Sequence, residues 1–202
     1  MKRILAVLVL AACATEERPM RDPATTALQV ELLERGSRDQ AIRDSAVRPG
    51  GGLDSALAAE MGRIDRDNAA WLKGEIARHG WPSRDKVGER ASEAAFLIVQ
   101  HATHDPAFQA SMLDTLTQAW ARKEIDGESY ALLFDRVQTE AGRKQRYGTQ
   151  ASFVGGAIVI DPMEDSTKVD SLRQTVGLGT LTDYRRVLDS VYRATATKKQ
   201  AP

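Results

Sequence analysis

The sequence of 202 residues has little of several residue types and patterns that would point directly to a function. It has one cysteine, which excludes disulfide bonds within the chain, and its 28 basic side chains are balanced by 28 acidic ones. No block of like charge stands out, so nucleic acid is not expected as a partner. The hydrophobic content of 42% is ordinary for a soluble protein and is enough for one core, which favours a single folded domain.

The single cysteine ends a segment that has the shape of a signal peptide. Two basic residues precede an apolar run from Ile4 that is too short to span a bilayer. The four residues from Leu10 to Cys13 resemble the lipobox of bacterial lipoproteins, in which cleavage before the cysteine leaves a lipid-modified N-terminus. We therefore expect residues 1–12 to be a signal peptide and Cys13 to be acylated. The alternative is an ordinary signal peptide with a chance cysteine.

The residues after the cysteine predict in which membrane the lipoprotein resides and how its folded domain is connected to the anchor. Ala14 stands where enteric-type bacteria tend to place an aspartate that retains lipoproteins at the inner membrane, so we expect an outer-membrane lipoprotein on the periplasmic side. The membrane would be reached through the acylated Cys13. Residues 14–24 are polar with two prolines, which is typical of a flexible tether. We expect residues 196–202 to be a disordered tail.

Apolar residues at helical spacing predict a mainly α fold over residues 25–195. From Ala94 to Val99 the apolar residues run all the way round, as in a helix that other helices enclose. We therefore expect a single-domain helical bundle around a central buried helix that spans Lys86 to Asp105. Further helices are expected at about 26–47, where Gly36 could divide the helix in two, and at 53–79, 106–123, 126–141, 167–176 and 181–193.

One segment has a different pattern and predicts a small β-hairpin near residues 145–161. Residues 143–150 alternate like a strand, two glycines follow at 155–156, and a β-branched run fills 157–160. On such a strand Tyr147 and Thr149 would share one face.

Two polar side chains occupy positions on core stripes where apolar residues are usual. Asn68 interrupts the stripe of the second helix, and His101 continues the stripe of the central helix at its end. Asp65 lies one turn before Asn68 on the same side. A buried amide or ring needs hydrogen-bond partners, so these residues indicate either a structural clamp or a binding site.

A metal site is a weaker hypothesis for the same region. His101 and His104 are three residues apart and Asp105 follows, but Asp105 with Pro106 is better explained as the start of the next helix. No cysteine or further histidine pair completes a set of ligands. We expect neither a metal nor another cofactor.

A third set of polar residues lies near the predicted hairpin. Arg136 could bring a guanidinium to Tyr147 and Gln150 for recognition of a carboxylate or phosphate. The alternative is a hydrogen-bonded brace between hairpin and helices.

Several short motifs stand out between about Leu53 and Tyr184. They are Asp65-x-x-Asn68, Gly80-Trp81-Pro82, Gln100-His101-Ala102, Asp135-Arg136, Gln145-x-Tyr147-Gly148-Thr149-Gln150 and Val176-Gly177-Leu178. Together they resemble an uncharacterised bacterial domain family, a domain of unknown function. The resemblance implies the domain boundaries and the choice of candidate residues but no reaction.

The candidate polar site is therefore Asp65, Asn68, His101, Arg136, Tyr147 and Gln150. The leading hypothesis is a lipid-anchored periplasmic domain that binds a small polar ligand or an envelope component. One rival is a hydrolase with His101 as general base and Asp65 orienting it. The other is a purely structural envelope lipoprotein.

Overall fold

The computed structural model describes residues 22–47, 55–154 and 157–196. The predicted signal peptide, Cys13, nearly all of the tether and nearly all of the tail lie outside the described residues. Among the residues that are described, none of the helices combines the length and the apolar character that a membrane crossing needs.

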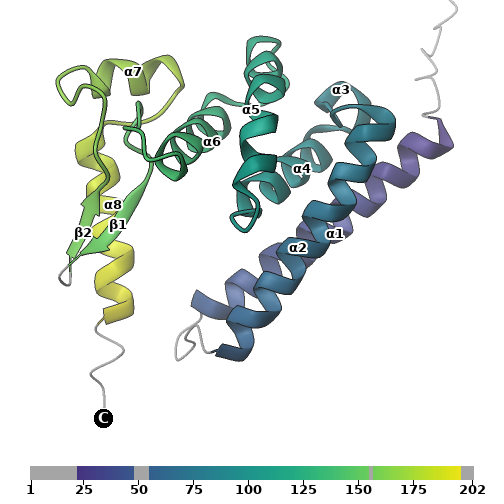
Figure 1. Ribbon diagram of the computed structural model, residues 1–202, viewed down its shortest axis with the longest axis horizontal. Coiled ribbons are helices and arrows are strands. Elements are labelled where there is room, and N and C mark those ends of the chain that lie inside the picture. The colour runs from purple at the N-terminus through teal and green to yellow at the C-terminus, as the bar shows by residue number, and fades with distance from the viewer. Residues whose placement is uncertain (1–21, 48–54, 155–156, 197–202) are drawn as a thin grey trace, which may run out of the picture.

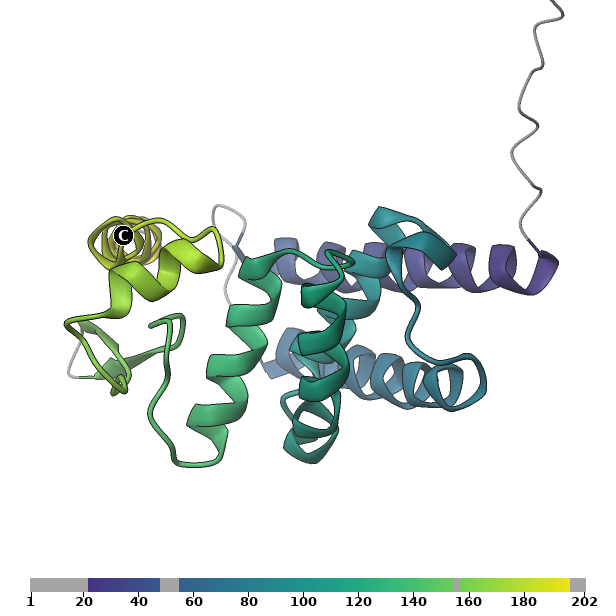
Figure 2. The ribbon, with the colours of Figure 1, turned by 90° about the horizontal axis from the view of Figure 1, so that it is seen from above.

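The protein is mainly α-helical, as predicted, and its two strands form one small antiparallel hairpin. The start of α1 lies at one end of the molecule, and the hairpin with α7 and α8 lies at the other end in both views (Figures 1 and 2). The elements are α1 (Pro23–Val47), α2 (Ser55–His79), α3 (Arg84–Val87), α4 (Glu89–His101), α5 (Pro106–Ala121), α6 (Gly127–Glu140), β1 (Ala151–Val154), β2 (Ala157–Ile160), α7 (Val169–Thr175) and α8 (Leu181–Ala196).

The helix α4 lies at the centre of the fold, as the all-round apolar run predicts. The side chains of Ala94, Ala95, Phe96, Ile98 and Val99 are buried, whereas Leu97 is half-buried, so the enclosure is not complete on every side. The helix contacts α1, α2, α3, α5 and α6. This burial supplies the main hydrophobic driving force around which the other helices are arranged.

The central helix is shorter than predicted, because the chain breaks at Gly88. This glycine has a φ of 85°, a conformation that L side chains rarely adopt, and it separates the short α3 from α4. The helix ends at His101, and Asp105 begins α5 as predicted: its side chain accepts a hydrogen bond of 2.9 Å from the backbone N–H of Phe108.

Gly36 does not divide the first helix, contrary to one of the alternatives drawn from the sequence. α1 runs unbroken from Pro23–Val47, and Gly36 is buried where this helix crosses α4. A Cβ atom at position 36 would lie 2.8 Å from Cβ of Ala94. The glycine therefore serves close helix packing rather than a turn.

The hairpin is shorter than the sequence pattern predicts. Strand β1 begins at Ala151 and pairs with β2 in the register Ala151 with Ile160, so residues 145–150 precede it as an irregular loop. The expectation that Tyr147 and Thr149 share a strand face is wrong, because the backbone N–H groups of both residues donate to the carboxylate of Asp135 rather than to a neighbouring strand. Near α7 the expected helix start at Thr167 is also wrong, since α7 begins at Val169 and Thr167 bonds Asp165.

Candidate functional site

The end of α4 carries a buried polar cluster at its contact with α1 and α2. Nδ1 of His101 lies 2.9 and 3.1 Å from the two carboxylate oxygens of Asp39, which is only 1% exposed. Arg43, one turn further along α1, lies 3.2 Å from Asp39 and donates a hydrogen bond of 2.7 Å to Asp65 on α2. These four residues, Asp39, Arg43, Asp65 and His101, are called the histidine cluster below.

A second arginine of α1, Arg35, binds Asn68 in a neighbouring set of contacts. Arg35 donates at 3.0 Å to Oδ1 of Asn68 and at 2.7 Å to Asp67, and its Nε donates at 2.8 Å to Glu31. The hydrogen bond from Arg35 lowers the pKa of Asp67. The guanidinium of Arg35 also stacks 4.6 Å from the ring centre of Trp71. Every carboxylate in this part of the network thus has a cationic partner.

Two buried donors at or beside the histidine cluster have no hydrogen-bond acceptor among the described residues. They are Nδ2 of Asn68, a side chain that is 2% exposed, and Nη1 of Arg43. The Arg43 atom lies 3.2 Å from Asp39 and is therefore ion-paired, although it lacks the alignment of a hydrogen bond. Leaving a buried donor without a hydrogen bond costs about 1–3 kcal/mol. Neither atom is exposed, so a bound group with oxygen acceptors would reach these donors only if neighbouring side chains moved.

The contact with Asp39 gives His101 a defined chemical character. A carboxylate next to Nδ1 favours the tautomer in which Nδ1–H donates to Asp39, and this leaves the lone pair on Nε2. Nε2 makes no hydrogen bond to another described residue, and the side chain is 21% exposed. The ring can therefore accept a proton or a hydrogen bond from a molecule that reaches the end of α4.

Three of the cluster side chains could also contribute metal ligands. Asp39, Asp65 and His101 each place one ligand atom within 4.8 Å of the others. Arg43 already contacts both carboxylates, so its guanidinium supplies the positive charge that a metal ion would bring. The other set considered from the sequence does not assemble: His104 is exposed, and Asp105 caps α5 and pairs with Lys73, whose hydrogen bond lowers the pKa of Asp105.

Arg136 makes no hydrogen bond or ion pair with the histidine cluster itself, but it binds the residue that precedes His101 in the chain. Its Nη1 donates at 3.3 Å to the backbone oxygen of Gln100, the residue before His101. When the amide of Gln100 is turned, its oxygen also accepts from Nε and Nη2 of Arg136, each at 3.3 Å. Burial lowers the pKa of Arg136, and the guanidinium has no ion pair with a described carboxylate.

Tyr147 and Gln150 belong to a separate structural network. The carboxylate of Asp135, which is fully buried, accepts from the backbone N–H groups of Arg146, Tyr147 and Thr149 at 2.7 to 3.1 Å. Gln150 donates to the hydroxyl of Thr149 at 3.1 Å. The Tyr147 ring packs edge-on against Tyr130 and Phe134, and its burial raises the pKa of its hydroxyl. These contacts fix the loop 145–150 against α6.

The six residues predicted from the sequence therefore fall into four groups: Asp65 and His101 belong to the histidine cluster, Asn68 binds Arg35 beside it, Arg136 binds the backbone oxygen of Gln100, and Tyr147 and Gln150 hold the loop. The sequence profile of one family, described as a family of unknown function (DUF6624), matches residues 26–197. The chain belongs to this family. No curated protein and no solved structure matches the chain.

The family match covers a longer stretch than the resemblance found from motifs, and it includes α1. That helix supplies the site residues that were not predicted, Asp39, Arg43 and Arg35. The available signal was their spacing of four residues, which places all three on one face of a helix. It was not informative by itself, because charged residues at this spacing also form ordinary surface pairs.

Proposed function

We propose that this family member is a lipid-anchored periplasmic domain that binds a small polar ligand at the histidine cluster. The observation that carries the proposal is Nε2 of His101, which makes no hydrogen bond to another described residue although its side chain is 21% exposed, beside buried donors of Asn68 and Arg43 that lack acceptors. Such donors are costly unless a partner satisfies them. A ligand with hydroxyl or carboxylate oxygens could donate a hydrogen bond to His101 and would accept from these donors once neighbouring side chains move.

Replacing Asn68 by leucine tests the binding role against a structural one. The change removes the unpaired donor, and Arg35 keeps its bonds to Asp67 and Glu31. If the amide serves a ligand, the melting temperature should stay the same or rise, while binding of small sugars, polyols or dicarboxylates by the wild type is lost in the variant. If the amide is a structural clamp, the variant should lose about 1–3 kcal/mol of stability.

Gln109→Leu is the matched control for a clamp. Gln109 is fully buried, and its amide donates to the backbone oxygens of Val99 and Gln100 at 2.9 and 3.1 Å. This variant should lose stability whatever the function of the cluster. His101→Leu also removes a partner of the buried Asp39, so it should lose stability under either reading, and its ligand response is the informative measurement. A loss of stability in Asn68→Leu equal to that of Gln109→Leu, without change in the ligand response of either variant, would favour a purely structural envelope lipoprotein.

The anchor is a separate part of the proposal, and its support is the lone Cys13 after a signal-like run. Mass spectrometry of the N-terminus in a native-like bacterial host should find an acylated Cys13. Cys13→Ser should leave the protein unanchored or unprocessed. Cleavage elsewhere with an unmodified Cys13 would contradict this part alone.

The contact between Asp39 and His101 favours hydrolysis as a second candidate function. The carboxylate orients the ring through Nδ1 and leaves Nε2 available to a water molecule, which is what a general base that activates water requires. His101→Gln keeps a donor for Asp39 and removes the base, so it should slow hydrolysis of a susceptible ester or amide by about 10²–10⁴-fold. Equal residual rates in wild type and His101→Gln across such substrates would exclude this candidate.

A further inference from the structure

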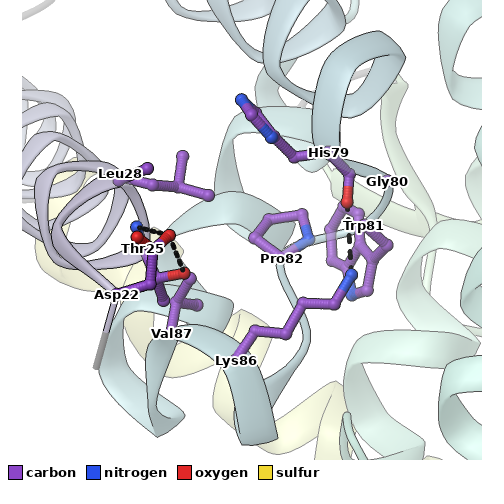
Figure 3. A pocket seen from close by; sticks show the side chains of 10 residues that line it. Asp22, Thr25, Leu28, His79, Gly80, Trp81, Pro82, Lys86 and Val87 are labelled. Carbon is purple, nitrogen blue, oxygen red and sulfur yellow. Dashed lines mark hydrogen bonds between the residues drawn. The ribbon is translucent and has the colours of Figure 1, made fainter. Parts of the chain in front are cut away.

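A pocket of about 290 Å³ lies at the opposite end of α1 from the histidine cluster (Figure 3). It is formed by the first residues of α1, the turn after α2 and the helix α3. Its apolar lining includes Leu28, Trp81, Pro82 and Val87. Its volume is close to the lower end of the range for small-molecule sites, about 300 Å³. None of its lining residues belongs to the histidine cluster.

Two opposite charges line this pocket, and neither forms an ion pair with a described residue. Asp22 lies at the start of α1, and its Oδ2 accepts only long hydrogen bonds of 3.4 and 3.5 Å from Thr25. Lys86 comes from α3 and donates at 3.2 Å to the backbone oxygen of His79, as Figure 3 shows. An ammonium group has three donors, so two remain for a ligand.

Trp81 forms part of the apolar lining, and its indole N–H has no hydrogen-bond partner among the described residues. The residue is 7% exposed, and this N–H group is itself buried. The indole is fixed by the turn Gly80-Trp81-Pro82, in which Gly80 has a φ of 72°. A ligand in this pocket therefore meets an apolar surface that includes the indole, one cation and one anion.

We propose that this pocket binds a small zwitterion, a dipeptide with an apolar side chain. Its ammonium group would pair with Asp22 and its carboxylate with Lys86, and its side chain would pack on Trp81 and Pro82. Each charged group of the ligand thus has an unpaired counterpart in the pocket, which a neutral sugar or a simple anion would not match.

An NMR titration with the dipeptide alanyl-leucine tests the proposal on the purified chain. The sequence has three tryptophans, and Trp81→Phe identifies the indole signal of Trp81. The dipeptide should shift this signal saturably. Its N-acetylated and C-amidated forms should each bind at least about 10-fold more weakly, which corresponds to about 1.4 kcal/mol for a lost charge pair. Equal binding of the blocked forms would overturn the proposal, as would no saturable shift at about 20 mM, a level at which even weak binding would appear.

Substitution of the two charged pocket residues tests which group of the dipeptide each one binds. Lys86→Met should weaken binding of alanyl-leucine about 10-fold and abolish the preference for a free carboxylate. Asp22→Asn should do the same for the free ammonium. Lys144→Met, at an exposed lysine that does not line the pocket, is the matched control and should bind normally. Unchanged affinity in both pocket variants, with melting temperatures near that of the wild type, would refute the assignment. His101→Leu should leave this binding intact, so the pocket and the histidine cluster are tested separately.

Discussion

The substitution Gly36→Ala tests the packing of α1 on α4 because two effects of opposite sign compete. In the middle of a helix, alanine is more favourable than glycine by up to about 1 kcal/mol. Against this, the new Cβ would lie 2.8 Å from Cβ of Ala94, whereas carbon atoms in contact prefer about 3.5–4.0 Å. Both atoms are attached directly to helix backbones, so no side-chain rotation relieves the contact and the helices must separate by about 1 Å.

Overpacking of this kind costs about 1–3 kcal/mol, so the steric effect should win and the variant should lose about 1–2 kcal/mol of stability. Gly74→Ala on α2 is the matched control. Its Cβ would meet only the flexible guanidinium of Arg78 at 3.8 Å, so this variant should gain about 0.5–1 kcal/mol. Urea denaturation followed by circular dichroism measures both changes.

A double-mutant cycle separates the steric effect from helix propensity. Ala94→Gly removes the opposing methyl group, so combining it with Gly36→Ala should show a favourable coupling of at least about 1 kcal/mol. Stabilisation of Gly36→Ala equal to that of Gly74→Ala, with no coupling, would refute the close crossing of α1 and α4.

Two further predictions concern the core and the high-pH limit of stability. Ile98→Ala should lower the free energy of unfolding by about 2–5 kcal/mol, since Ile98 is 2% exposed, whereas Leu97→Ala should cost less because Leu97 is half-buried. A loss of less than about 0.5 kcal/mol for Ile98→Ala in denaturant melts would contradict the central position of α4. Burial raises the pKa of Tyr147 and Tyr184 above the usual value near 10.0, so the unfolded chain releases these protons first and stability should fall as the pH rises above about 10. Tyr147→Phe should make that fall shallower in melts recorded between about pH 8 and pH 11, and an unchanged slope would argue against the burial of its hydroxyl.

The fold could be predicted where the pattern is local and strong. The run from Ala94 to Val99 has no polar side, so its enclosure follows from the sequence alone, and Asp105 with Pro106 defines a helix start through its own backbone geometry. The loop 145–150 could not be predicted, because its course depends on the buried carboxylate of Asp135, and a carboxylate that collects several backbone N–H groups gives no periodic signal.

The candidate site shows the same limit at longer range. Asn68 and His101 could be identified because each replaces an apolar residue on a stripe that its own helix defines. Asp39 is 62 residues from His101 in the chain, and its burial depends on the ring that it meets. A polar residue on one core stripe therefore predicts a polar partner on the neighbouring helix without saying which residue it is. Here α1 supplies it: Arg35, Asp39 and Arg43 lie one turn apart, opposite Asn68, His101 and Asp65 respectively. Because the three pairs face each other at the same spacing, three helices can hold one buried carboxylate, Asp39, and several partly buried charges where they meet.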